Sequence, residues 1–223
     1  MIQDSFERIR TNNPWWGNVN AINQDSLVVE FEEQKIKYFH PLLSDFPSKK
    51  DGVLTIRGPR RVGKSTLFRL LIRRLLLEKG VPSESVFFFP CDRVEDYNDL
   101  FNIIKTYLDF ARPRTNQRLF IFLDEISFVT DWQKTIKEMT DVGLLKNSLT
   151  LLTGSSLLDL KFGSEFLSGR RGDFAFPDIF YYPLNFRQFV QTVEPKFDIN
   201  KNNLELSYHL PKLQKLFSDY SLT

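Results

Sequence analysis

The chain has 223 residues, of which 42% are hydrophobic and 26% are charged, so it has the composition of a folded globular protein and not of a disordered one. Its formal net charge is only +2, and charge alone therefore indicates neither nucleic-acid binding nor membrane binding. The length accommodates one main domain, with or without a small appendage.

Cysteine and histidine are too sparse for a disulfide framework or a metal-ligand pattern. Cys91 is the single cysteine, and the two histidines, His40 and His209, are far apart in the sequence. The N-terminal residues lack a basic patch followed by an apolar run, and no apolar stretch approaches membrane-spanning length. We therefore expect a cytoplasmic protein that does not interact with membranes.

The first fifty residues are expected to form an N-terminal extension. Residues 13–17, with the sequence NPWWG, carry a turn signal with two large aromatic residues. A possible short strand follows at residues 27–31.

From residue 53 onward, short apolar runs alternate with stretches of helical spacing. The runs predict strands at residues 53–57, 86–89, 119–123 and 149–152, with a weaker fifth at 176–182. Helices are expected from Lys64 to Gly80 with Arg69 facing outward, over 100–108, after a cap at Asp131, and around 186–193 and 210–220. This alternation predicts an α/β fold with three αβα layers and a mostly parallel five-stranded sheet, whose carboxyl edge is expected to bind ligands.

The segment GPRRVGKST at residues 58–66 lies between the first strand and the first helix, and it matches the phosphate-binding pattern GxxxxGK[ST]. An accidental match is the alternative, and the strand and helix around the segment argue against it. Lys64 is expected to neutralise the terminal phosphates, Ser65 to bind Mg²⁺ and Thr66 to contact the first phosphate. The residues expected to cradle the nucleotide are Gly58, Pro59, Arg60, Arg61, Val62, Gly63, Lys64, Ser65 and Thr66, with the side chains of Arg60 and Arg61 solvated.

Two acids, Asp124 and Glu125, end the apolar strand 119–123. At the carboxyl edge of the sheet, Asp124 would hold Mg²⁺ and Glu125 would act as the general base on the attacking water. The alternative is that both acids simply open the next helix.

Two further segments carry candidate residues. After the fourth strand, Ser155 or Ser156 would orient the water or sense the terminal phosphate, or else would cap a helix. In the segment SGRRG at residues 168–172, a guanidinium of Arg170 or Arg171 would neutralise charge that develops on the transferred phosphoryl group, in its own site or a neighbour's. An ordinary exposed arginine pair is the alternative there.

Taken in order, these segments resemble the archaeal and bacterial AAA+-type P-loop ATPases that usually carry a further C-terminal domain. The matching segments are NPWW at 13–16, GPRRVGKST at 58–66, FLDEI at 122–126, LTGSS at 152–156, SGRRG at 168–172 and PLNFRQFV at 183–190. The resemblance implies an ASCE-type sheet with a strand added between the phosphate-loop strand and the acidic strand. It also implies ATP and Mg²⁺ as cofactors, Ser155 as the sensor and Arg170 as the arginine finger.

The resemblance divides the chain into an extension (1–50), a P-loop ATPase core (51–184) and the start of a helical lid (185–223). We expect Trp15 and Trp16 to pack the extension onto the core and not to contact the nucleotide base. The expected partners are ATP, possibly further copies of the chain, and a protein or C-terminal domain beyond it. Nothing in the composition indicates nucleic acid.

Three functions are compatible with these residues: an ATP-hydrolysing conformational switch, a nucleotide-gated interaction module, and a small-molecule kinase. The intact pair Asp124 and Glu125 argues for hydrolysis, because a pure binding module needs no base. A kinase would not need the serine-rich end of the fourth strand or Arg170. ATP is favoured over GTP because no guanine-reading Asn-Lys-x-Asp sequence follows the acidic strand.

Overall fold

A computed structural model of the chain describes residues 2–155, 165, 167–194 and 210–221. Its centre is a five-stranded sheet in the spatial order β2-β3-β4-β1-β5, in which every pair of neighbouring strands is parallel. The strands are β1 (Gly52–Arg57), β2 (Val86–Pro90), β3 (Leu119–Asp124), β4 (Ser148–Gly154) and β5 (Asp178–Phe180). The five expected strands are thus confirmed, and β4 lies between β1 and β3 as the resemblance implied.

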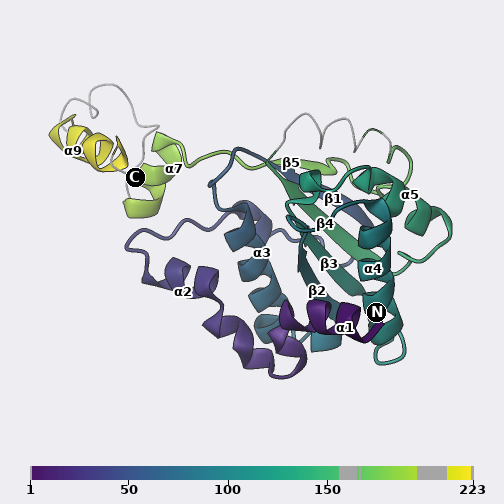
Figure 1. The fold of residues 1–223 in the computed structure, drawn as a ribbon. Helices are drawn as coiled ribbons and strands as arrows, with labels where there is room; N and C mark the ends of the chain where they lie inside the picture. The colour runs from purple at the N-terminus through teal and green to yellow at the C-terminus, as the bar shows by residue number, and fades with distance from the viewer. Residues whose placement is uncertain (1, 156–164, 166, 195–209, 222–223) are drawn as a thin grey trace.

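Helices cover both faces of this sheet, which explains why β2 and β3 are apolar almost throughout. The helices are α3 (Lys64–Arg73), which continues as a π-helical turn η4 (Arg74–Glu78), α4 (Tyr97–Ala111) and α5 (Trp132–Asp141). Figure 1 shows α3 on one face and α4 with α5 on the other. Two buried clusters, one on each side of the sheet, form the core. The predicted three-layer α/β architecture is therefore confirmed.

The N-terminal residues form helical turns and no strand. They comprise α1 (Ile2–Thr11), the 3-10 turns η1 (Pro14–Trp16) and η2 (Val19–Gln24), α2 (Ser26–Glu33) and the 3-10 turn η3 (Pro41–Leu43). The strand expected at residues 27–31 is wrong. Asp25 caps α2 by accepting a hydrogen bond from the Leu27 amide, and the buried Val28 and Phe31 are three residues apart, as on one helix face.

Hydrogen bonds from the side chains of Asn13, Trp15 and Trp16 attach these turns to β2. Trp15 and Trp16 both donate from Nε1 to the carbonyl of Val86, at 2.9 and 3.0 Å. The side chain of Asn13 exchanges hydrogen bonds with the backbone of Phe88. Because Val86 begins β2, the indoles lie at the amino end of that strand, away from the carboxyl edge of the sheet.

The expectation that Arg69 faces outward is wrong, because the N-terminal turns cover α3 at this position. Its side chain is 15% exposed, its guanidinium lies 3.5 Å from the centre of the Phe88 ring, and it pairs with Asp25 at 3.0 Å. Arg69 therefore joins the N-terminal turns, α3 and the sheet.

The cap of α5 also differs from expectation. Asp131 stands at the N-cap of α5 with φ 59°, but its carboxylate accepts from Lys134 Nζ and makes no bond to a backbone N–H of the helix. Near the C-terminus, α7 (Phe186–Val193) and α9 (Leu210–Ser221) confirm the two expected helices. Their residues Phe189, Val190 and Leu216 form a small cluster of their own, and both helices project from one side of the sheet in Figure 1.

The remaining short turns connect these elements. They are η5 (Ser83–Ser85), which leads into β2, and η6 (Ile126–Phe128), which follows β3. Among the described residues, no helix is long and apolar enough to cross a membrane.

Candidate functional site

The loop at residues 58–63 connects β1 to α3 and depends on its two glycines. Gly63, the N-cap of α3, has φ 95°, a conformation that disfavours a side chain. A Cβ on Gly58 would lie 2.1 Å from the carbonyl oxygen of Tyr181, so only glycine fits there. The first helical hydrogen bond runs from Leu67 N to Gly63 O. The backbone N–H groups before Leu67 thus lack helical partners, and such groups attract anions.

Lys64 begins α3 and folds back over this loop. Its side chain is buried, with the residue 4% exposed, and Nζ donates to the carbonyls of Gly58 and Pro59 at 3.0 and 2.8 Å. Burial lowers the pKa of Lys64, while the charges of Glu125 and Asp124 act in the opposite direction. The ammonium group therefore lies within electrostatic range of both acids.

Asp124 is the last residue of β3 and is 7% exposed. Its Oδ1 accepts a short hydrogen bond from the hydroxyl of Thr153, which stands at the end of the neighbouring strand β4. The pairing of Leu123 with Leu152 brings Asp124 and Thr153 beside each other at the carboxyl edge. The carboxylate is thus held by a neutral donor.

Glu125 adopts a left-handed backbone conformation, φ 54°, which is uncommon for a residue with a side chain and costs conformational energy. Its amide donates to Thr153 Oγ1 at 3.0 Å, and its Oε2 accepts from the amide of Ser155 at 3.0 Å. Arg60 Nε in turn donates to Ser155 Oγ at 3.4 Å. The carboxylate of Glu125 therefore bridges β3 and the end of β4.

Thr153 is the residue that the sequence analysis did not single out. Its hydroxyl donates to Asp124 and accepts from the Glu125 amide, so one side chain orients both acids. The sequence predicts that Thr153 ends the fourth strand. It does not predict the strand register that places Thr153 beside Asp124.

The structure brings most of the predicted site residues together. Pro59, Arg60 and Arg61 are exposed, while Val62 in the loop and Ser65 and Thr66 at the start of α3 are half-buried. Ser155 contacts both Glu125 and Arg60, whereas Ser156 lies outside the described residues.

Arg170 is placed away from this group. It forms an ion pair with Asp141 at 2.5 Å, at the carboxyl end of α5. The next residue, Arg171, accepts a backbone hydrogen bond from Val53, near the start of β1. Arg170 thus lies towards the amino edge of the sheet and does not reach the loop at residues 58–63 of its own chain.

The oxygen ligands of the site suit magnesium. No group of three or more His, Cys, Asp or Glu side chains that could hold a metal by themselves occurs within the described ranges. Mg²⁺ usually needs only one or two protein ligands and takes the rest from water and phosphate. The carboxylate of Asp124 and the hydroxyl of Ser65 are ligands of this kind.

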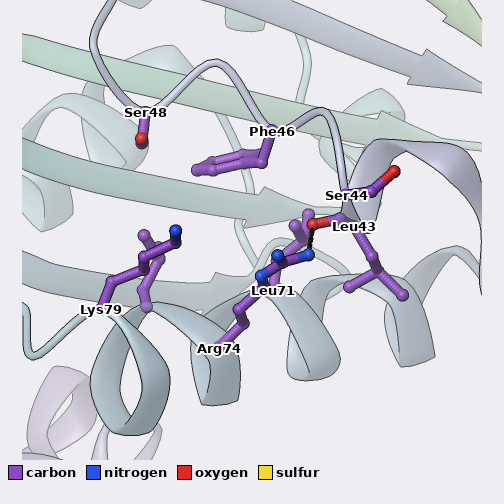
Figure 2. A pocket seen from close by; sticks show the side chains of 8 residues that line it. Leu43, Ser44, Phe46, Ser48, Leu71, Arg74 and Lys79 are labelled. Carbon is purple, nitrogen blue, oxygen red and sulfur yellow. Dashed lines mark hydrogen bonds between the residues drawn. The ribbon is translucent and has the colours of Figure 1, made fainter.

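A separate pocket lies at the other end of α3. Figure 2 shows Arg74 and Lys79 on one side of it and Phe46 and Ser48 on the other, with Arg74 donating to the carbonyl of Leu43. Its volume is about 60 Å³. Lys64 lies at the opposite end of the same helix. This pocket is therefore separate from the site that contains Asp124, Glu125 and the phosphate loop.

Comparison with known proteins fits this geometry. A family model described as an AAA domain matches residues 50–190, and the chain belongs to that family. AAA domains are P-loop nucleotide-binding domains of the ATPase type. The chain is 27% identical over 180 residues to an uncharacterized protein of Haemophilus influenzae; the match covers 76% of this chain and 38% of that protein.

The solved structures that it resembles are more distant. The Aeropyrum pernix Orc1 protein, solved in complex with DNA, has a TM-score of 0.49 and 15% identity, covering 78% of this chain and 48% of that one. Cdc6p from Pyrobaculum aerophilum has a TM-score of 0.46 and 14% identity, covering 68% and 45%. A Walker-type ATPase of Pyrococcus abyssi has a TM-score of 0.43 and 14% identity, covering 69% and 55%. Similarity at this level carries no conclusion about function.

Proposed function

We propose that this chain binds ATP with Mg²⁺ and hydrolyses it, and that hydrolysis drives a conformational switch. The observation that carries the proposal is the convergence of Lys64, Asp124 and Glu125 at the carboxyl edge of the sheet, beside the N-terminus of α3. A buried cation, two acids and unpaired helix amides are what a magnesium-bound triphosphate requires.

Each side chain has a separate role in this proposal. Lys64 exchanges its bonds to the loop carbonyls for bonds to the terminal phosphates of the nucleotide. Asp124 and Ser65 hold Mg²⁺, which when bound offsets the negative charge of the phosphates. Glu125 accepts a proton from the attacking water, and the amide of Ser155 and the hydroxyl of Thr153 keep it in position.

Arg170 acts in trans in this proposal, because it lies away from the loop of its own chain. A second copy of the chain would then receive its guanidinium at the terminal phosphate, which makes the site complete only in an oligomer. Ser155, already linked to Glu125 and Arg60, is the sensor of that phosphate. We further propose that α7 and α9 begin a lid over the site.

A nucleotide-gated interaction module with little hydrolysis is the second candidate. The ion pair of Arg170 with Asp141 favours it, because this pairing occupies the residue proposed as the arginine finger. Such a module would bind ATP as tightly as the enzyme but would not turn it over.

The Glu125→Gln variant separates the two functions. It keeps the shape and the acceptor oxygen of the side chain but cannot take a proton, so ATP turnover should fall by roughly 100- to 10,000-fold while ATP affinity stays within a few-fold. Steady-state phosphate release and equilibrium binding measure the two effects.

The exposed Glu138 on α5 gives the matched control, and Glu138→Gln should leave turnover unchanged. Wild-type chain that binds ATP without releasing phosphate, at any concentration at which it self-associates, would support the interaction module instead. Equal turnover in Glu125→Gln and wild type would remove Glu125 as the base.

A further inference from the structure

Tyr181 is bound to the base of the phosphate loop through its backbone. It follows β5, and its amide donates to the carbonyl of Arg57, the last residue of β1, at 2.6 Å. Its own carbonyl oxygen occupies the space that a side chain on Gly58 would need. Any displacement of this tyrosine backbone would therefore displace the loop.

The ring of Tyr181 is held against the N-terminal segment. It stacks on His40, with ring centroids 4.6 Å apart and an interplanar angle of 15°. The imidazole is itself fixed, because Nδ1 of His40 accepts from the amide of Leu42 at the start of η3. Tyr181 is 8% exposed, and its hydroxyl oxygen lies 3.5 Å from where a Cβ on Gly63 would be. The ring thus points its hydroxyl at the N-cap of α3.

This hydroxyl makes no hydrogen bond to any residue that the structure describes. The other tyrosines of similar burial or position differ: Tyr107 donates to the carbonyl of Glu84, and Tyr38 accepts from Gln188. Burial raises the pKa of Tyr181 to about 12, so the phenol is a neutral donor near neutral pH. The residue is largely buried, but its hydroxyl oxygen is not enclosed, so this free donor beside the loop can be reached by a ligand.

We propose that the Tyr181 hydroxyl donates a hydrogen bond to a phosphate oxygen of the nucleotide held by residues 58–66, an inference that rests on the proposed function. The geometry favours phosphate because Gly63 is the N-cap of α3, where backbone amides without helical partners attract an anion. Through its stack on His40, the same contact links the bound phosphate to the N-terminal segment at residues 38–43.

Tyr181→Phe tests this contact, because it keeps the ring and its stack and removes only the hydroxyl. Equilibrium binding should show Mg-ATP affinity reduced about tenfold, the size expected for one hydrogen bond to a charged acceptor. Inorganic tripolyphosphate, used as a competitor, should lose affinity by a similar factor. Tyr182→Phe is the control, because Tyr182 is 68% exposed and stacks on Phe180, and its ATP affinity should equal that of wild type.

The outcomes distinguish this inference from the proposed function. If wild type and Tyr181→Phe bind ATP with equal affinity, the role of the hydroxyl is overturned and the proposed function stands. A loss for ATP with none for tripolyphosphate would place the hydroxyl on the nucleoside and overturn the phosphate contact. Wild type that does not bind ATP would overturn the proposed function and this inference with it.

Discussion

Two clusters of charged side chains lie near β1 and are stabilised in different ways. In the strand cluster, Arg57, Arg171 and Asp178, the Oδ1 atom of Asp178 accepts from both guanidinium groups, at 2.7 and 2.9 Å. In the loop cluster, Lys64, Asp124 and Glu125, no ion pair forms among the residues that the structure describes.

The partners of the loop cluster are neutral instead. Lys64 donates to carbonyls, Asp124 accepts from a hydroxyl and Glu125 accepts from an amide. Opposite charges that pair with one another hold the fold together, and they exert only a weak electrostatic field on a ligand. Charges oriented by neutral groups keep their field, which is the arrangement that electrostatic stabilisation of a reacting phosphate needs. The difference distinguishes a cluster that holds the fold together from the cluster that we propose to bind the nucleotide.

Removing Arg171 should have the largest effect on stability. Besides Asp178, its guanidinium donates to the Thr55 hydroxyl and to the carbonyls of Pro177 and Val53, and the residue is 8% exposed. Arg171→Ala should lower the free energy of unfolding by about 3 kcal/mol, because Asp178 loses one of its two cations and the neighbouring carbonyls and hydroxyl lose a charged donor. Chemical denaturation measures the change.

The neighbouring Arg170 is the control for this variant. It makes one ion pair at the surface, so Arg170→Ala should change the free energy of unfolding far less than Arg171→Ala does. ATP affinity of Arg171→Ala at a temperature where the variant is folded should stay within a few-fold of wild type. A loss of affinity as large as that of a phosphate-loop variant would make the strand cluster part of the site.

Thr153→Val should have a smaller effect on stability and a distinct effect on activity. The substitution keeps the side-chain shape but removes the hydroxyl that serves both acids, at a cost of about 2 kcal/mol in the free energy of unfolding. Turnover should fall as well, because the backbone of Glu125 loses the bond that helps hold it in the left-handed conformation.

Thr150 on the same strand offers a close control. It is 1% exposed, and its hydroxyl has no hydrogen-bond partner among the described residues. Thr150→Val should therefore be neutral or stabilising, since no bond is lost and an unsatisfied polar atom is removed. If both variants cost the same in stability and turnover, Thr153 would be an ordinary core residue.

The strands and the phosphate loop could be predicted because their signals are local. Apolar runs such as residues 119–123 mark strands covered on both faces, and the spacing of glycine, lysine and serine in residues 58–66 marks the loop directly. The strand end at Asp124 then places the acids on the same edge as the loop, since parallel strands end together.

The features that escaped prediction depend on contacts between distant segments. Residues 27–31 have the composition of a strand, but Asp25 caps a helix there. Arg69 has the spacing of an exposed residue, yet the N-terminal turns cover it. Arg170 and Arg171 are adjacent in sequence, and only the fold leaves the first partly exposed and buries the second. The contacts of Thr153 and Tyr181 likewise depend on register and on packing across the sheet.

Equilibrium binding of Mg-ATP to wild type and to Lys64→Ala tests the central claim most directly. Lys79→Ala is the control, because Lys79 is an exposed lysine near the other end of the same helical region. We predict that Lys64→Ala weakens ATP binding by at least roughly 100-fold, because the charged bonds to the phosphates are lost, while Lys79→Ala binds like wild type. Lys64→Ala that stays folded and binds Mg-ATP with wild-type affinity would contradict the account.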